Sequence, residues 1–147
     1  MFSRQDLASF YEGAHHKSGW SASWGQAVEG LTPAQAAWKP SPERHSIWQI
    51  VNHISFWREE VLRRAAGQPK AGEDVVDQEN WRGPDETTER AWNSAKERFR
   101  ASHEAIAKSA QDDRAPLDGV LNMMGHDFYH VGQIMFLRAM QGLPPVE

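Results

Sequence analysis

The chain has 147 residues, with 16 basic and 20 acidic side chains and no cysteine. This length fits a single domain over residues 1–147, which we expect to bury a core without disulfide bonds. The lack of cysteine excludes thiolate metal sites and cysteine nucleophiles, and a formal net charge of −4 argues against binding to nucleic acid. No apolar run approaches the roughly 20 residues of a membrane span and no signal-peptide pattern is present, so we expect a cytoplasmic protein without a membrane partner.

The first predicted helix begins after Ser3, because Ser3 and Asp6 match an acidic variant of the capping box. We expect this helix to continue to about Glu29 and to stop near Gly30. Residues 31–42 follow as an ordered connection, since they contain three prolines. This part of the chain therefore predicts one long helix and a connection.

The second predicted helix is capped by Ser46 and ends before Gly67. Its apolar stripe recurs at three- and four-residue spacing and consists of Ile47, Ile50, Ile54, Trp57 and Val61. The connection at 67–84 exceeds the roughly 2–8 residues usual between bundle helices, so it is either mobile or functional. Trp81 lies in this connection, where an aromatic side chain pins a loop or lines a pocket.

Asp85 is the expected cap of a third helix that runs to about Ser109. Its predicted core residues are Trp92, Phe99 and Ile106. The fourth predicted helix covers 116–140 and stops ahead of Gly142. Its apolar residues cover nearly the whole circumference, which indicates a buried helix. Four long helices without an alternating strand pattern predict an all-α four-helix bundle.

Two histidines in the last helix, His126 and His130, are spaced four residues apart. On a helix they share one face, with their Cβ atoms about 5–6 Å apart, which suits two ligands of one metal ion. Burying an imidazole in an apolar helix costs desolvation unless its nitrogens are occupied. The pair therefore fits either a metal site or a hydrogen-bonded structural pair.

His53 is the candidate third ligand, because it lies mid-helix at the margin of the apolar stripe of the second helix. Its alternative is a partly exposed polar residue. Three neutral imidazoles from two facing helices would bind a divalent ion such as Zn²⁺, Ni²⁺ or Fe²⁺, of which we favour Zn²⁺. They leave coordination positions open for water or substrate, as catalytic sites do.

Both histidine segments resemble those of the DinB-like (damage-inducible) superfamily. Residues 45–54 are similar to its N-terminal histidine segment, and residues 125–134 are similar to its C-terminal His-x-x-x-His-x-Gly-Gln-Ile segment. The connection at 31–42 resembles the one that follows the family's first helix. The likeness covers nearly the whole chain in order and spacing.

This resemblance implies a four-helix bundle of up-down-down-up topology and a divalent metal ion on His53, His126 and His130. It also implies homodimers, and the first helix holds more apolar residues than one bundle is expected to bury. These interface candidates are Phe2, Phe10, Tyr11, Trp20 and Trp24. The family includes transferases and isomerases that use bacillithiol or mycothiol.

We therefore expect a metal-dependent enzyme acting on a small molecule. Its reaction is either thiol-dependent S-transfer in detoxification, with a low-molecular-weight thiol as cosubstrate, or metal-dependent hydrolysis. The alternative is a non-catalytic bundle associated with the stress response, in which the metal is structural or is not bound. The residues themselves do not choose between these reactions.

Residues one or two turns from the ligands share their face and are the candidate pocket residues. They are Gln49 and Trp57 in the second helix and Asn122 and Gln133 in the fourth. Gln133 either contacts a ligand of the metal or ties two helices together. Glu60 is the acid/base candidate of the second helix, although a solvated glutamate is the favoured interpretation.

The sequence also carries predictions for Asp127, for Gly132 and for the histidines outside the proposed site. Asp127 is expected to face another helix and either to support the fold or to orient the ligands. Gly132 costs roughly 1 kcal/mol relative to alanine within a helix, which predicts close approach of a neighbouring helix. His15 and His16 are expected at the surface or hydrogen-bonded, and His103 is expected to be solvated.

A di-iron bundle is the competing metal site. Its carboxylate-x-x-His spacing occurs twice, in Glu12 with His15 and in Asp127 with His130. This interpretation leaves His53 and His126 without a role, so the three-histidine site is favoured.

Overall fold

The computed structural model describes residues 3–19, 22–112 and 117–146. Within these ranges the chain is helical and contains no strand. The helices are α1 (Arg4–His16), α2 (Trp24–Val28), α3 (Pro33–Ala37), α4 (Ile47–Ala65), α5 (Glu73–Glu79), α6 (Glu89–Gln111) and α7 (Leu117–Met140). Among the described residues, no helix is both long enough and apolar enough to cross a membrane.

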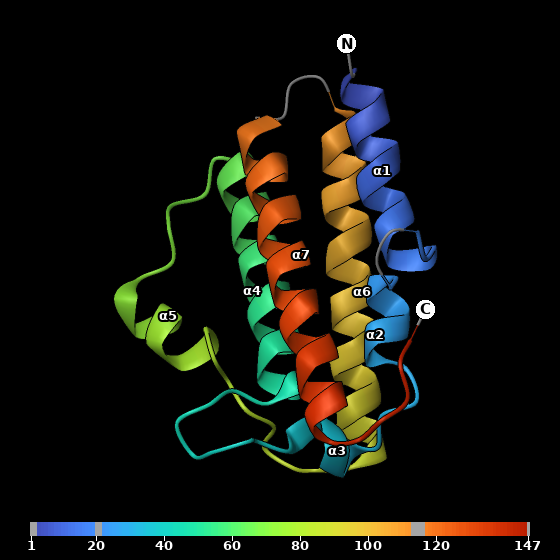
Figure 1. Cartoon of the computed structure of the whole chain (residues 1–147). Coiled ribbons are helices and arrows are strands. Elements are labelled where there is room, and N and C mark those ends of the chain that lie inside the picture. Colours follow the sequence, from blue (N-terminus) through green and yellow to red (C-terminus); the bar gives the residue numbers. More distant parts are fainter. Residues whose placement is uncertain (1–2, 20–21, 113–116, 147) are drawn as a thin grey trace.

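The long helices α1, α4, α6 and α7 form a bundle (Figure 1). In it α1 and α7 run in one direction, and α4 and α6 run in the opposite one. α6 packs against α1 and α4, and α7 packs against α4. The predicted all-α bundle with up-down-down-up topology is confirmed. Because α4 and α6 are parallel, the connection at 67–84 has to return along the length of the bundle, which explains its length.

The first predicted helix is shorter than expected. α1 begins at the predicted capping box, in which Ser3 and Asp6 bond each other's backbone, but it ends at His16. Lys17 is extended, and Ser23 caps the separate helix α2. The prediction of one continuous helix to Glu29 is wrong, because the new start at Ser23 carries Trp24 into the core, where its exposure is 0%.

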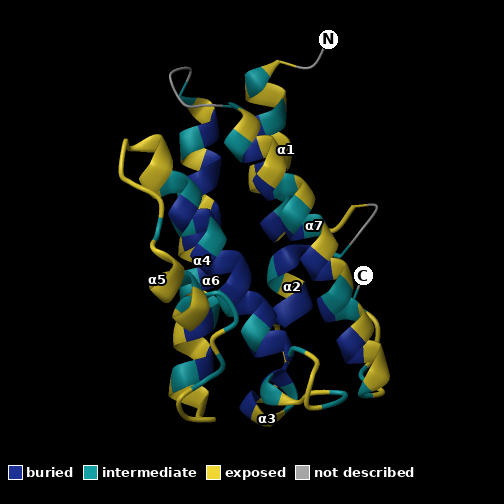
Figure 2. Cartoon of the chain, turned by 90° about the vertical axis from the view of Figure 1, so that its left-hand side faces the viewer, coloured by how far each residue is buried: buried dark blue, intermediate teal, exposed yellow. Residues whose placement is uncertain are grey.

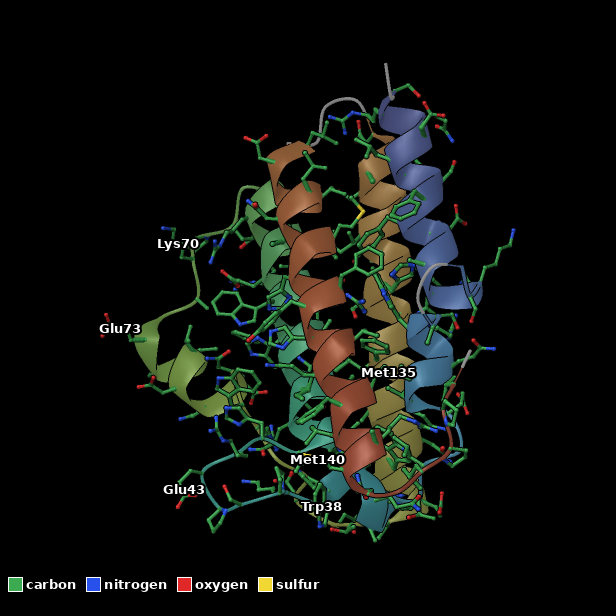
Figure 3. All side chains as sticks on the ribbon, in the orientation of Figure 1. Trp38, Glu43, Lys70, Glu73, Met135 and Met140 are labelled. Atoms are coloured by element: carbon green, nitrogen blue, oxygen red, sulfur yellow. The ribbon has the colours of Figure 1, made fainter. Side chains whose placement is uncertain are left out.

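The two predicted connections each contain a short helix. α3 lies within residues 31–42 and starts with a capping box between Thr32 and Gln35. α5 lies within residues 67–84 and stands outside α4, where Lys70 and Glu73 point away from the bundle (Figure 3). Both connections are therefore more regular than the sequence pattern indicated.

α6 starts later than predicted. Thr88, not Asp85, is its N-cap, and the Thr88 hydroxyl accepts a hydrogen bond from the Ala91 amide. Asp85 instead pairs with Arg82, whose Nη2 lies 2.7 Å from Asp85 Oδ2. The predicted cap Asp85 thus forms an ion pair with Arg82 and does not cap α6.

Buried residues lie mainly on the inner faces of the helices (Figure 2). Of the predicted stripe of α4, Ile47, Ile50 and Ile54 are buried, whereas Trp57 and Val61 are partly buried and pack against the core. The predicted core residues of α6 are fully buried, namely Trp92, Phe99 and Ile106. His103 joins them with 0% exposure, so its expected solvation is wrong. Tyr11 stacks on His103 with ring centroids 4.6 Å apart, which places a polar aromatic cluster beside the apolar core.

One face of α7 is exposed, although its composition predicted a fully buried helix. Its large apolar residues at the surface are Leu121, Tyr129, Phe136 and Met140. Of the interface candidates in the first predicted helix, Phe10 is exposed, whereas Tyr11 and Trp24 are buried. Phe2 and Trp20 lie outside the described residues. The exposed apolar surface is therefore mainly on α7.

Candidate metal centre

Three imidazoles meet between the antiparallel helices α4 and α7. His53 extends from the middle of α4 toward His126 and His130, which lie one turn apart on α7. The Nε2 atoms of His53 and His126 are 3.0 Å apart. The potential ligand atoms of the three residues all lie within 4.8 Å of one another, and in the described part of the chain no other such group forms.

The other nitrogen of each ring faces an oxygen acceptor. His53 Nδ1 lies 2.8 Å from Asn80 Oδ1 and 3.0 Å from Asn80 O. His130 Nδ1 lies 2.7 Å from Gln133 Oε1. His126 Nδ1 lies 3.3 Å from Asp127 Oδ1. Because an acceptor requires a proton on Nδ1, each ring carries its lone pair on Nε2.

Burial favours the neutral form of two of the three imidazoles. It lowers the pKa of His53 to about 4, and it also lowers the pKa of His130 below its ordinary value. Neither imidazole is protonated near neutral pH. With Nδ1 of both rings against an oxygen acceptor, the Nε2 atoms of His53 and His126 face each other across 3.0 Å.

This donor set fits a divalent ion. Two zinc-bound nitrogens at about 2.0–2.1 Å from a tetrahedral ion are about 3.3 Å apart, close to the observed separation. Neutral imidazoles suit Zn²⁺, Ni²⁺ and Fe²⁺. The competing di-iron site does not form among the described residues. The carboxylate of Asp127, which that site would need, bonds Arg58 and Tyr11 instead.

The connection between α4 and α6 forms one wall of the centre. The indole of Trp81 stacks on His53 with centroids 3.7 Å apart and on His45 with centroids 3.8 Å apart, both nearly parallel. Two rings this close to one indole cannot share a face, so Trp81 is sandwiched between them. Of the two roles predicted for Trp81, this stacking fits the one in which the side chain pins a loop.

The sequence profile of the DinB superfamily matches residues 20–134. The chain belongs to the DinB superfamily. The match includes all three histidines of the cluster, whereas α1 precedes it. Searches of curated proteins and of solved structures returned no match. Family membership therefore rests on the profile, and the bundle and the histidine cluster agree with it.

Three of the four predicted pocket residues bond the groups that surround the histidine cluster. Gln49 Nε2 donates to the Trp81 carbonyl at 2.8 Å, and Trp57 Nε1 donates to Asn80 Oδ1 at 2.8 Å. Gln133, besides accepting from His130, donates to the Tyr129 hydroxyl at 3.1 Å. The bonds of Trp57 and Gln133 hold the Nδ1 partners of His53 and His130 in place.

The fourth pocket residue, Asn122, is exposed one turn before His126. It lines a pocket of about 370 Å³ with Trp57, Val61 and Met123. A second pocket, of about 430 Å³, lies in the opposite direction along α7 and is lined mainly by apolar side chains. It also contains His45 and Gln133, so the two pockets flank the histidine cluster.

Glu60 is not a solvated residue, contrary to the favoured interpretation. Its side chain is 2% exposed, and its oxygens accept from Arg63 Nη1 at 2.7 Å and Arg64 Nε at 3.0 Å. The Ala71 amide adds a third bond at 2.9 Å. The carboxylate thus anchors the start of the 67–84 connection, and it makes no contact with the histidines.

Sequence analysis missed Arg58, Asn80 and the partners of Asp127. Arg58 is fully buried and pairs with Asp127 at 2.9 Å, where it occupies the stripe position four residues after Ile54. A charged residue at an apolar stripe position was the available signal. Burial alone would raise the pKa of Asp127, but the charge of Arg58 and three hydrogen bonds hold it below its usual value. Nothing in the sequence around Asn80 indicated that this residue contacts His53.

Proposed function

We propose that this DinB superfamily protein binds one divalent metal ion, preferably Zn²⁺, through Nε2 of His53, His126 and His130. The observation that carries the proposal is the 3.0 Å separation of two Nε2 atoms whose rings each place Nδ1 against an oxygen acceptor. A cation between them replaces lone-pair repulsion with two bonds. Three protein ligands are typical of catalytic zinc sites, and the ion supplies a Lewis acid with an open position.

The proposed reaction is transfer of a low-molecular-weight thiol to a small electrophile. Three neutral ligands leave the double positive charge of the ion uncompensated, which favours an anionic sulfur near neutral pH. The sulfur forms a bond to an electrophilic carbon, the leaving group departs with its electron pair, and the thiol proton passes to solvent. The apolar pocket of about 430 Å³ beside Gln133 suits an apolar substrate body. Metal-dependent hydrolysis is the alternative reaction for the same site.

A thiol assay tests the reaction. Zinc-loaded protein, mixed with L-cysteine and a chromogenic aryl halide, should consume the halide faster than the metal-free protein, and His53→Ala should abolish the difference. The variant removes one of three ligands and leaves α4 otherwise intact. A rate equal to that of the metal-free protein contradicts thiol transfer, and hydrolysis of a chromogenic ester without thiol would favour the hydrolase.

We also propose that the protein forms a homodimer through the exposed face of α7. Between residues 119 and 140 the only charged side chains are Asp127 and Arg138, and both are buried. Gly125 and Gly132 lie on the exposed face, where, apart from the adjoining residues and nearby backbone of α7, no described atom lies within 4 Å of the position of an added Cβ. The predicted close neighbour of Gly132 is thus not found within the described chain, and a second copy of α7 would supply it. A neutral apolar face is complementary to itself, as a two-fold interface requires.

Light scattering tests the dimer. Phe136→Glu should convert a dimer at micromolar concentration into a monomer, because it places two charges at an apolar interface. Val75→Glu is the matched control, since Val75 is an exposed apolar residue of α5 outside this face. A wild-type monomer, or a Phe136→Glu variant that remains dimeric, contradicts the proposed interface.

A further inference from the structure

A fully buried carboxylate lies directly behind the ligand His126. Asp127 Oδ1 is 3.3 Å from His126 Nδ1, while Oδ2 accepts from the Tyr11 hydroxyl at 2.7 Å and from Arg58 Nε at 2.9 Å. Three helices therefore converge on one side chain, α1 through Tyr11, α4 through Arg58 and α7 through Asp127 itself. The two oxygens have separate partners, and only Oδ1 faces the histidine cluster.

The guanidinium of Arg58 leaves Oδ1 available. Arg58 contacts Asp127 through Nε alone, its Nη1 donates to the Phe99 carbonyl at 2.8 Å, and its buried Nη2 has no hydrogen-bond partner. A forked pair would have used both carboxylate oxygens and satisfied a second nitrogen. The ring of Phe99 lies under the guanidinium at 4.5 Å and that of Trp24 at 5.4 Å, which fixes its orientation. Arg58 and Asp127 thus form one hydrogen bond where a forked pair would form two, and Asp127 Oδ1 remains available to His126.

We propose that Asp127, held by Arg58 and Tyr11, is a positioning residue for the metal ligand His126. Its Oδ1 accepts a hydrogen bond from Nδ1–H of His126, which selects the tautomer with a free Nε2 and fixes the ring plane toward His53. The proposal rests on the metal site proposed above, and it assigns the buried polar network a role in that site. Because Tyr11 precedes residues 20–134, the support of the site extends beyond the matched part of the chain.

The competing explanation is that the Arg58–Asp127 pair only stabilises the fold. The two roles respond differently to an apolar replacement. A buried ion pair replaced by apolar residues of similar volume leaves stability unchanged or improved, whereas removal of one partner is strongly destabilising. A purely structural pair can therefore be replaced without effect on the histidines, and a positioning residue cannot.

The experiment uses the triple variant Tyr11→Phe/Arg58→Met/Asp127→Leu, which removes the network without leaving a buried charge. Two quantities are measured beside wild type. The first is the tautomer of His126 in metal-free protein, from long-range proton–nitrogen NMR spectra. The second is zinc affinity, from competition with a chromophoric chelator. We expect a mixture of His126 tautomers, a 10–100-fold weaker zinc affinity and a thermal midpoint at least as high as that of wild type.

His53 serves as the internal control, because its Nδ1 bonds Asn80 and its tautomer should not change. If the triple variant does not fold, the double variant Arg58→Met/Asp127→Leu provides the same comparison. A His126 that keeps its Nδ1 proton, together with zinc affinity within twofold of wild type, overturns the proposal. If wild type binds no zinc, the metal proposal fails alone, and the tautomer of His126 in the metal-free protein still decides the role of Asp127.

Discussion

Purified without added metal, wild-type protein should contain about one divalent ion per chain, and His126→Ala/His130→Ala should contain almost none. The double variant leaves one imidazole, and a single neutral ligand does not retain zinc against buffer and competing chelators. Elemental analysis of untagged protein measures both values. The expected loss is complete, which makes this the largest effect predicted for the site.

His16→Ala is the matched control for the metal measurement. His16 is an exposed histidine of α1 outside the cluster, so the substitution removes an imidazole without removing a ligand. It should retain the ion. Wild type that takes up no metal even after reconstitution would leave His126 and His130 as a structural pair. A large drop in thermal midpoint on chelation, without thiol or ester chemistry, would favour the non-catalytic bundle with a structural metal.

Acid should destabilise the metal-free protein steeply between about pH 6.5 and pH 4, because of two histidines outside the metal centre. Burial, followed by the charge of Arg58, lowers the pKa of His15 and of His103 to about 3, from an ordinary value of 6.5. In this window the unfolded chain binds the two protons and the folded chain does not. The free energy of unfolding therefore falls with decreasing pH, by at most about 2.7 kcal/mol per unit for two protons.

Urea denaturation of His15→Phe/His103→Phe tests this cause. The aromatic stack, with centroids 4.9 Å apart in wild type, is kept, while both titrating groups are removed. The variant should lose the share of the slope that His15 and His103 contribute between pH 6.5 and pH 4, and the share of His53, whose pKa burial also lowers, should remain. His16→Phe is the control, because His16 is exposed and solvated in both states. An unchanged slope in the double variant would assign the acid sensitivity to other groups, such as His53.

Local signals predicted the helices where side chains cap or pattern them directly. Ser46 with Gln49 forms a capping box, and α4 ends ahead of Gly67, whose φ of +78° suits glycine. The two histidine segments were also recognisable, since i, i+4 spacing fixes the relative position of His126 and His130. The bundle fold places α4 against α7, and the structure brings His53 next to this pair as expected.

What the sequence could not predict depends on contacts between distant segments. Asn80 and Trp81 reach His53 only because the 67–84 connection returns along α4, and no local pattern sets that path. His103 lies in a charged stretch, yet the rings of Tyr11 and Trp24 enclose it. The Arg58–Asp127 pair joins two helices far apart in sequence. The single domain and the cytoplasmic location stay predictions.

In the proposed metal site, the sandwich of Trp81 between His45 and His53 would link metal affinity to the conformation of a surface segment. Asn80, beside Trp81, holds the ring of His53, so the geometry of the proposed ligand set would depend on the docking of residues 80–81. The apparent dissociation constant equals the intrinsic one divided by the docked fraction. Substitutions on the outer side of α5, remote from every ligand, would thus tune metal occupancy, with about 1.4 kcal/mol of undocking weakening binding tenfold.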